Sequence, residues 1–234
     1  MTTSIALLAL LAPLQFPDAA PAQTLRTGPP NILLIVADDL GVDMVGAYGE
    51  APAPPCTPNI DALAAGGMLF RNAWANPICS PTRSAILTGR HAFRTGVGDL
   101  VDPDEPGLTL GELTIPELLT GYASSCTGKW HLGGSLGFLH PNLSGFGHYA
   151  GTLHGQIPTY SLWPKVIDGQ PLVGFGYATT DTTDDAITAL QTMPEPWFLY
   201  VAYQAPHAPL HEPCLLYTSP SPRDLSTSRM PSSA

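Results

Sequence analysis

An unbroken apolar run near the start of the chain restricts the fold more than any other stretch. Residues 31–37 read Asn-Ile-Leu-Leu-Ile-Val-Ala, and Asp38 and Asp39 follow at once. A run of this length, rich in branched side chains, is typical of a strand buried on both faces of a parallel sheet. Ligands of such sheets bind outside the carboxyl ends of the strands. The sequence therefore predicts a buried strand that delivers two adjacent carboxylates to a ligand-binding edge, although Asp-Asp-Leu-Gly alone also fits a solvated turn.

Helix and strand patterns alternate along the rest of the chain. The expected helices begin at a capping residue or proline and end near glycine, and they cover residues 57–63, 79–89, 114–119 and 181–190. The further expected strands are residues 68–74, residues 123–127 and the apolar run at residues 197–203. Residues 133–176, with weak periodicity, are expected to form long loops or a small excursion over the site. This order predicts an α/β fold with a doubly wound, mostly parallel sheet.

Cys79 is expected at the positively polarised start of the helix that Gly89 closes. Ser80 is a residue type that caps helices, and Pro81 suits a first turn. Arg83 follows Cys79 by four residues, about one helical turn, so its guanidinium can reach the same space. Taken alone, the motif also fits a buried or disulfide-bonded cysteine beside a surface arginine. A nucleophile and a cation at one helix end would suit chemistry on an anion.

Two predicted strands end in basic or titratable side chains. After the strand at residues 123–127 the chain continues Gly-Lys-Trp-His-Leu-Gly, and in extended backbone Lys129 and His131 would project to one side, with Trp130 on the other. The strand at residues 197–203 leads to His207 within Pro-His-x-Pro. A single histidine at a strand end is more often structural than catalytic. The remaining histidines are expected at the surface or a pocket rim: His91, His140, His148, His154 and His211.

Together these motifs resemble those of the type I sulfatases. The stretch from Cys79 to Arg83 matches the Cys-x-Pro-x-Arg modification motif, Gly-Lys-Trp-His-Leu-Gly matches the second signature, and Asp-Asp and Pro-His-x-Pro stand in the family order. The resemblance covers residues 31 to about 213. The segment Leu-Thr-Gly-Arg-His-Ala-Phe-Arg-Thr-Gly is most similar to the arylsulfatase B-like and bacterial arylsulfatase branch. The resemblance to the type I sulfatases implies an alkaline-phosphatase-like fold, and we expect the C-terminal part of that fold to be missing.

The resemblance also implies the reaction. A modifying enzyme would oxidise Cys79 to formylglycine, and the hydrated aldehyde would cleave sulfate monoesters of a small molecule or a glycan. Calcium, with magnesium as the alternative, would be held by Asp38, Asp39 and the modified Cys79. A phosphonate or phosphate ester hydrolase of the same superfamily remains an alternative.

The family assigns a role to each of the other motif residues. Arg83 would orient the diol, and Lys129 would neutralise developing negative charge. His131 would be the base for the second hydroxyl, and His207 would protonate the departing oxygen. The metal ligands and the second lysine that the family places further downstream are expected to be missing, so a truncated, inactive chain is a further alternative.

Composition limits the partners. The chain has 234 residues with 44% hydrophobic and 12% charged side chains, which is typical of a globular protein. Its net charge is −10, and nine Lys and Arg are too few for a nucleic-acid surface. No run after the leader is long and apolar enough to predict a transmembrane segment. An anionic substrate would therefore depend on a few local cations.

Four segments are expected along the chain. Residues 1–22 have the short apolar run and small-residue site of a signal peptide, which predicts a secreted, periplasmic or lysosomal-type location. Residues 23–30 are expected to be a linker and residues 31–213 the N-terminal part of a sulfatase catalytic domain. Residues 214–234 are rich in Ser, Pro and Thr, and we expect a non-family tail that is an artefact of the sequence.

Overall fold

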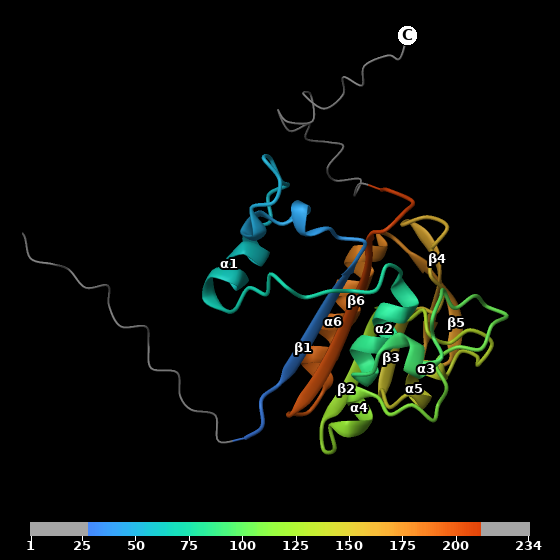
Figure 1. Cartoon of the computed structure of the whole chain (residues 1–234). Coiled ribbons are helices and arrows are strands. Elements are labelled where there is room, and N and C mark those ends of the chain that lie inside the picture. Colours follow the sequence, from blue (N-terminus) through green and yellow to red (C-terminus); the bar gives the residue numbers. More distant parts are fainter. Residues whose placement is uncertain (1–27, 212–234) are drawn as a thin grey trace, which may run out of the picture.

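A six-stranded mixed sheet forms the centre of the computed structural model, which describes residues 28–211 (Figure 1). The strand order is β1-β6-β2-β3-β4-β5. The strands are β1 (Ile32–Asp38), β2 (Ala123–Lys129), β3 (His148–Thr152), β4 (Leu162–Ile167), β5 (Gln170–Phe175) and β6 (Trp197–Pro206). Strands β1, β6, β2 and β3 are parallel, and β4 and β5 add an antiparallel edge. The carboxyl ends of β1, β6 and β2 therefore lie side by side. The expected signal peptide and tail lie outside the described residues.

Helices cover both faces of the parallel strands. The helices are α1 (Pro58–Gly66), α2 (Cys79–Thr88), α3 (Ala92–Thr95), α4 (Ile115–Leu118), α5 (His140–Leu143) and α6 (Ala178–Thr192), with short 3-10 turns η1 (Val42–Met44) and η2 (Gly46–Tyr48). Successive β6 side chains alternate between the two layers. Leu199 and Val201 pack with Ala189 of α6, whereas Tyr200 packs in the cluster that contains Leu87 of α2. This two-sided cover confirms the predicted α/β fold. None of the helices within residues 28–211 combines the length and hydrophobicity needed to cross a lipid bilayer.

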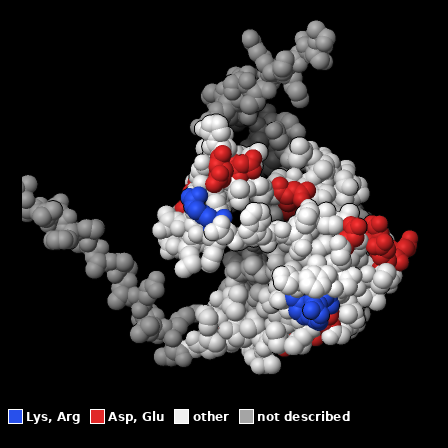
Figure 2. Space-filling view, in the orientation of Figure 1, with Lys and Arg blue, Asp and Glu red and all other residues white. Residues whose placement is uncertain are grey.

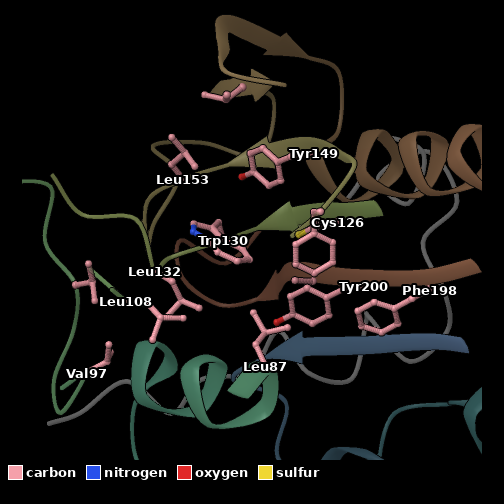
Figure 3. Packing of buried hydrophobic residues seen from close by; sticks show 14 residues of the cluster. Leu87, Val97, Leu108, Cys126, Trp130, Leu132, Tyr149, Leu153, Phe198 and Tyr200 are labelled. Atoms are coloured by element: carbon pink, nitrogen blue, oxygen red, sulfur yellow. The ribbon is translucent and has the colours of Figure 1, made fainter. Parts of the chain in front are cut away.

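The larger core cluster is rich in aromatic side chains and lies under α2 (Figure 3). Trp130 meets Phe146 edge to face at 5.9 Å and Tyr149 at 6.5 Å between ring centroids. Phe146 stacks on Phe198 of β6 at 5.9 Å. Each fully buried side chain of this size contributes roughly 1.5–3 kcal/mol or more to stability. The core therefore fixes β2 and β6, whose ends carry the site, against α2.

One expectation for β1 is wrong. The strand forms as predicted, but Leu33 is 48% and Ile35 is 52% exposed, so it is not buried on both faces. Its alternate residues Ile32, Leu34 and Val36 pack on the core. Strand β1 is one of the two edge strands of the sheet within residues 28–211, and α6 packs mainly on β6 and β2. The apolar run therefore predicted the strand correctly, but the exposure of Leu33 and Ile35 follows from the position of β1 at an edge of the sheet.

Two loop and strand assignments also fail. Residues 68–74 form no strand; Met68 is 76% and Trp74 is 92% exposed, because no neighbouring strand pairs with this apolar segment. Residues 133–176, expected to form long loops or a small excursion over the site, contain α5, β3, β4 and β5, so the prediction of long loops alone is wrong. Strand β3 contains a glycine and few apolar residues, and its parallel pairing with β2 supplies the regularity that its own sequence lacks.

Candidate active site

The starting residues of α2 and the ends of three neighbouring strands form one site. Helix α2 begins at Cys79 and ends at Gly89, whose φ of 66° is the left-handed conformation that glycine favours. Ile78 is the N-cap residue, so the expected cap at Ser80 is wrong. The Ser80 hydroxyl instead donates to the His131 carbonyl oxygen at 2.9 Å and accepts from the Val101 amide at 3.2 Å. The residue next to the cysteine therefore fixes the loop after β2.

A buried charge network lies behind Cys79. Asp38 forms an ion pair with Lys129 through one carboxylate oxygen and lies 3.3 Å from Arg83 Nη2 through the other. Arg83 Nη1 donates to the Lys129 carbonyl oxygen at 2.6 Å. Asp38 is 5%, Arg83 1% and Lys129 0% exposed. Two cations face one carboxylate here, so the buried group carries excess positive charge, which favours an anion nearby.

Arg83 keeps unused hydrogen-bonding capacity. Burial lowers the pKa of the guanidinium, but Tyr200 and Asp38 raise it, and the resulting pKa lies above the ordinary value. Arg83 therefore stays charged. Its Nε atom is buried and finds no hydrogen-bond acceptor within residues 28–211, and its Nη2 atom has only the 3.3 Å ion pair with Asp38. An unpaired buried donor of this kind suits a bound oxyanion or an oxygen on residue 79.

His131 is paired with the cysteine. Its Nδ1 lies 3.1 Å from Cys79 Sγ. Burial and then the charges of Lys129 and Arg83 lower the pKa of His131 to about 3. The imidazole is therefore neutral near pH 7, and one of its ring nitrogens keeps a lone pair that can accept a hydrogen bond. The expected extended geometry is wrong, because His131 has a φ of 54°, yet its side chain still reaches the site. Trp130 was expected to face away from Lys129 and His131, and it lies in the hydrophobic core.

Asp39 and His207 lie at the solvent-exposed side of the site. Asp39 has a φ of 63°, and its side chain is 65% exposed. His207 Nε2 lies 3.8 Å from Asp39 Oδ2. The other ring nitrogen, Nδ1, lies 2.7 Å from the Ala208 carbonyl oxygen, so Nδ1 carries a hydrogen and Nε2 is the atom left for a substrate. Tyr160 donates its hydroxyl to the His207 carbonyl oxygen at 2.8 Å.

Two hollows meet at Cys79. A hollow of about 210 Å³ is bordered by Asp38, Asp39 and Arg83, and another of about 290 Å³ by His131 and His207. Cys79 borders both. The hollow that Arg83 borders is the cation side of Cys79, and the hollow that His131 and His207 border is its open side.

Sequence reasoning missed several residues near the site. Tyr160, Asp102 and Gln156 lie in segments with weak periodicity and no motif, so nothing in their spacing identified them. His154 borders the 290 Å³ hollow, in agreement with the expected rim position. His140, by contrast, is fully buried, so its expected surface position is wrong.

The described residues supply only part of a calcium site. Carboxylates are suitable donors for this hard cation, but it takes about six to eight oxygen ligands. Asp38 is already paired with Lys129 and Arg83, which leaves Asp39 as the exposed carboxylate. Within residues 28–211 no three His, Cys, Asp or Glu side chains gather in a metal-binding arrangement. Asp38 and Asp39 alone therefore do not complete a coordination shell.

The fold is the alkaline-phosphatase-like fold of sulfatases, as comparison with solved structures shows. The structure of Ps i-CgsB in complex with k-i-k-neocarrahexaose superimposes with a TM-score of 0.69 at 31% identity, covering 78% of this chain and 46% of that one. The structure of BT4656 in complex with its substrate D-Glucosamine-2-N, 6-O-disulfate gives a TM-score of 0.66 at 32% identity, covering 76% of this chain and 35% of that one.

The Sulfatase family model matches residues 30–223, and the chain belongs to this family, among the type I sulfatases. The N-acetylgalactosamine-6-sulfatase of Sus scrofa is 38% identical over 215 residues, and arylsulfatase J of Mus musculus is 33% identical over 220. These matches cover 78% and 85% of this chain but 41% and 36% of the relatives. The chain therefore spans about two fifths of the length of these curated relatives. The arylsulfatase B-like branch stays a prediction.

Proposed function

We propose that the protein hydrolyses sulfate monoesters through a formylglycine made from Cys79. The observation that carries this proposal is the position of Cys79, at the start of α2, 3.1 Å from the neutral His131 ring and in front of the Arg83 and Lys129 charges. A cysteine placed this way would be converted by a modifying enzyme, and its hydrated aldehyde would carry two hydroxyl groups.

The reaction has two steps. In the first, one hydroxyl of the diol gives its proton to the Asp39 carboxylate and attacks sulfur, and the bond between sulfur and the ester oxygen breaks. His207, protonated at Nε2, gives that proton to the departing alcohol. In the second, His131 takes the proton of the remaining hydroxyl, the carbonyl reforms, and sulfate leaves residue 79. The two hydroxyls explain why an aldehyde is needed, since a serine ester would have no such exit.

The buried cations stabilise the charge that develops on the sulfate oxygens. Lys129 and the unpaired Arg83 donor are fixed in place before the substrate arrives, so they need little reorganisation. Preorganised donors of this kind each contribute about 3–4 kcal/mol in other enzymes. We also propose calcium, or magnesium, beside Asp38, Asp39 and the modified Cys79, with other oxygen donors completing its shell. When bound, it would supply Lewis-acid polarisation of the sulfate.

The proposal includes the partners and the location. The substrate is a sulfated small molecule or glycan, and Cys79 requires a formylglycine-generating or equivalent enzyme. We propose export through the leader at residues 1–22 to a secreted, periplasmic or lysosomal-type compartment. Nucleic acid is not among the proposed partners, because nine basic residues in 234 provide no basic surface.

The proposal predicts conversion of Cys79 in a host that makes the modifying enzyme. Trypsin cleavage after Arg71 and Arg83 releases residues 72–83, and mass spectrometry should find the aldehyde there. The Pro81→Ala variant, in which the motif is broken, should keep the thiol. The converted protein should release sulfate from an aryl sulfate faster than phosphate from the matching aryl phosphate.

Unmodified thiol at residue 79, while a control sulfatase is converted in the same cells, would contradict the proposal. Conversion with a preference for the phosphate ester would support the phosphohydrolase alternative instead. The Cys79→Ala protein provides the background rate for both substrates.

A further inference from the structure

The hollow of about 290 Å³ on the open side of Cys79 contains residues that no motif explains. Cys79, His131 and His207 form its inner border, and the remaining lining comes from two segments, residues 100–103 and 154–156. This hollow lies across Cys79 from the one that Asp38 and Asp39 border. If sulfate binds on the cation side, the alcohol part of the ester lies in this second hollow, next to His207.

The segment that carries His154 and Gln156 is anchored against the site. Its flanking residues Leu153 and Ile157 are 9% and 1% exposed, and the His131 amide donates to the Leu153 carbonyl oxygen at 3.1 Å. Gly155 lies directly on the His131 ring, because a Cβ atom there would collide with the imidazole. The two polar side chains on either side of Gly155 are exposed at the hollow. Their backbone is therefore held in place while their side chains remain available.

The size and lining of the hollow suit one polar ring. Ligand pockets span roughly 300–1,000 Å³, so 290 Å³ is at the small end of the range. His154, Gln156 and Asp102 offer hydrogen-bond donors and acceptors, which match hydroxyl groups. Val101 and Pro103 add apolar surface for the carbon face of a ring. A flat aromatic alcohol would leave most of these polar groups without a partner.

The charge around the hollow opposes additional anionic groups on the substrate. Residues 99–105 read Asp-Leu-Val-Asp-Pro-Asp-Glu, and neither Lys nor Arg belongs to the described lining. On the face that Figure 2 shows, acidic side chains form several separate clusters and Lys and Arg form two further patches. A second sulfate on the ligand would face Asp102, which borders the hollow, without a lysine or arginine of the described lining to pair with it.

We propose that this hollow binds the alcohol part of the substrate as one uncharged, hydroxyl-rich ring, so that the preferred ligand is a monosulfated sugar. His154 and Gln156 would bind its hydroxyls, and the acidic segment 99–105 would disfavour polysulfated chains. This inference rests on the proposed function and adds the substrate class and the residues that select it.

Protection of the Cys79 thiol tests the proposal without turnover. The 234-residue chain is made in a host without the modifying enzyme and treated with iodoacetamide, and alkylation of residues 72–83 is followed by mass spectrometry. Inorganic sulfate probes the cation side, a monosaccharide 6-sulfate probes both sides, and a trisulfated disaccharide probes the charge selection. The monosaccharide sulfate should protect Cys79 at about tenfold lower concentration than inorganic sulfate, and the trisulfated disaccharide should do no better than inorganic sulfate.

Variants separate the hollow from the sulfate site. Gln156→Ala should bring protection by the sugar sulfate close to the level of inorganic sulfate while leaving the latter unchanged. Gln170→Ala, an exposed glutamine on β5, is the matched control and should change neither. Asp102→Asn should improve protection by the trisulfated disaccharide.

The two proposals fail in distinguishable ways. Equal protection by inorganic sulfate and the sugar sulfate, or stronger protection by the trisulfated disaccharide, would overturn the inference about the hollow and leave the proposed function intact. Absence of protection by all three ligands in a protein with a native circular-dichroism spectrum would overturn both.

Discussion

The hydrogen-bond partners of the buried His140 determine which of its ring nitrogens carries the hydrogen. Trp130 donates its indole N–H to His140 Nδ1 at 2.9 Å, and His140 Nε2 lies 2.7 Å from the Leu108 carbonyl oxygen. Because an indole can only donate, Nδ1 must accept and Nε2 must carry the hydrogen. Burial lowers the pKa of His140, and it stays neutral. A proton on Nδ1 would face the Trp130 donor.

This arrangement predicts a loss of stability in acid. The folded-state pKa of His140 lies below its unfolded value near 6.5, so below about pH 6.5 the unfolded chain binds a proton that the folded chain refuses. The free energy of unfolding should therefore fall as the pH drops, by at most about 1.4 kcal/mol per pH unit for this group. Urea unfolding at about pH 7 and pH 5.5 measures the effect. His140→Gln should reduce the pH dependence, and the exposed His91→Gln should not. Equal slopes in all three proteins would contradict the assignment.

At the residue scale, the motifs predicted a site and the structure added its pairings. Cys79, Arg83, Lys129, His131 and His207 were predicted from motifs that resemble those of the type I sulfatases, and the structure brings these side chains together. The contact between Gly155 and His131, and the hydrogen bond from Tyr160 to His207, could not be predicted from the sequence. They join segments far apart in sequence, and no local periodicity reports such a contact.

At the element scale, the antiparallel edge is held to α6 by one buried lysine. Lys165 of β4 is 5% exposed, and its Nζ lies 2.6 Å from both Asp181 and Asp185 of α6. Burial lowers the pKa of Lys165, but the two carboxylates raise it above its ordinary value. Burial raises the pKa of Asp185 in spite of the lysine. The two carboxylates therefore offset the cost of burying the Lys165 charge, whereas the charged form of Asp185 depends on Lys165.

Removing the lysine should therefore leave a poorly compensated acid. Lys165→Met should lower the free energy of unfolding by about 2 kcal/mol, less than the ~3–5 kcal/mol for a fully buried pair because both carboxylates are partly exposed. Asp185→Asn should cost less in the Lys165→Met background than alone, with a coupling of about 1 kcal/mol in a double-mutant cycle by urea unfolding. Asp184→Asn, at an exposed neighbour, is the control. Additive effects would show that the pair does not hold the two elements together.

Elements with strong patterns were predicted well. The predicted helix at residues 114–119 corresponds to α4, whose Thr114 and Glu117 form a capping box, and the strand at residues 197–203 corresponds to β6. Residues 68–74, which were also predicted to be a strand, contain Arg71 and Asn72 and pair with no strand. Strands β3 to β5 have weak patterns but find partners in the sheet. Pairing between distant segments, which a single sequence does not display, decides these cases.

On the scale of the whole molecule, the net charge of the chain and the charge of the buried site act on a sulfate ester in opposite directions. The chain carries a net charge of −10, which repels the ligand at long range. The buried Asp38, Arg83 and Lys129 group carries excess positive charge, which attracts it at short range. Salt screens exposed charges much more than buried ones. The two contributions can therefore be separated by ionic strength.

We expect inorganic sulfate to protect Cys79 better at about 150 mM NaCl than at about 10 mM. Between these concentrations the Debye length falls from about 30 Å to about 8 Å, so the long-range repulsion is screened while the buried cations keep their effect. The half-protecting sulfate concentration should fall by about twofold. Competition by chloride would act in the opposite direction, so an improvement cannot arise from it. The Asp104→Asn, Glu105→Gln double variant removes two exposed acids near the open hollow and should show a smaller salt effect. If protection instead weakens with salt to the same extent in both proteins, local attraction alone governs binding, and the net charge of the chain has no part in selecting its ligand.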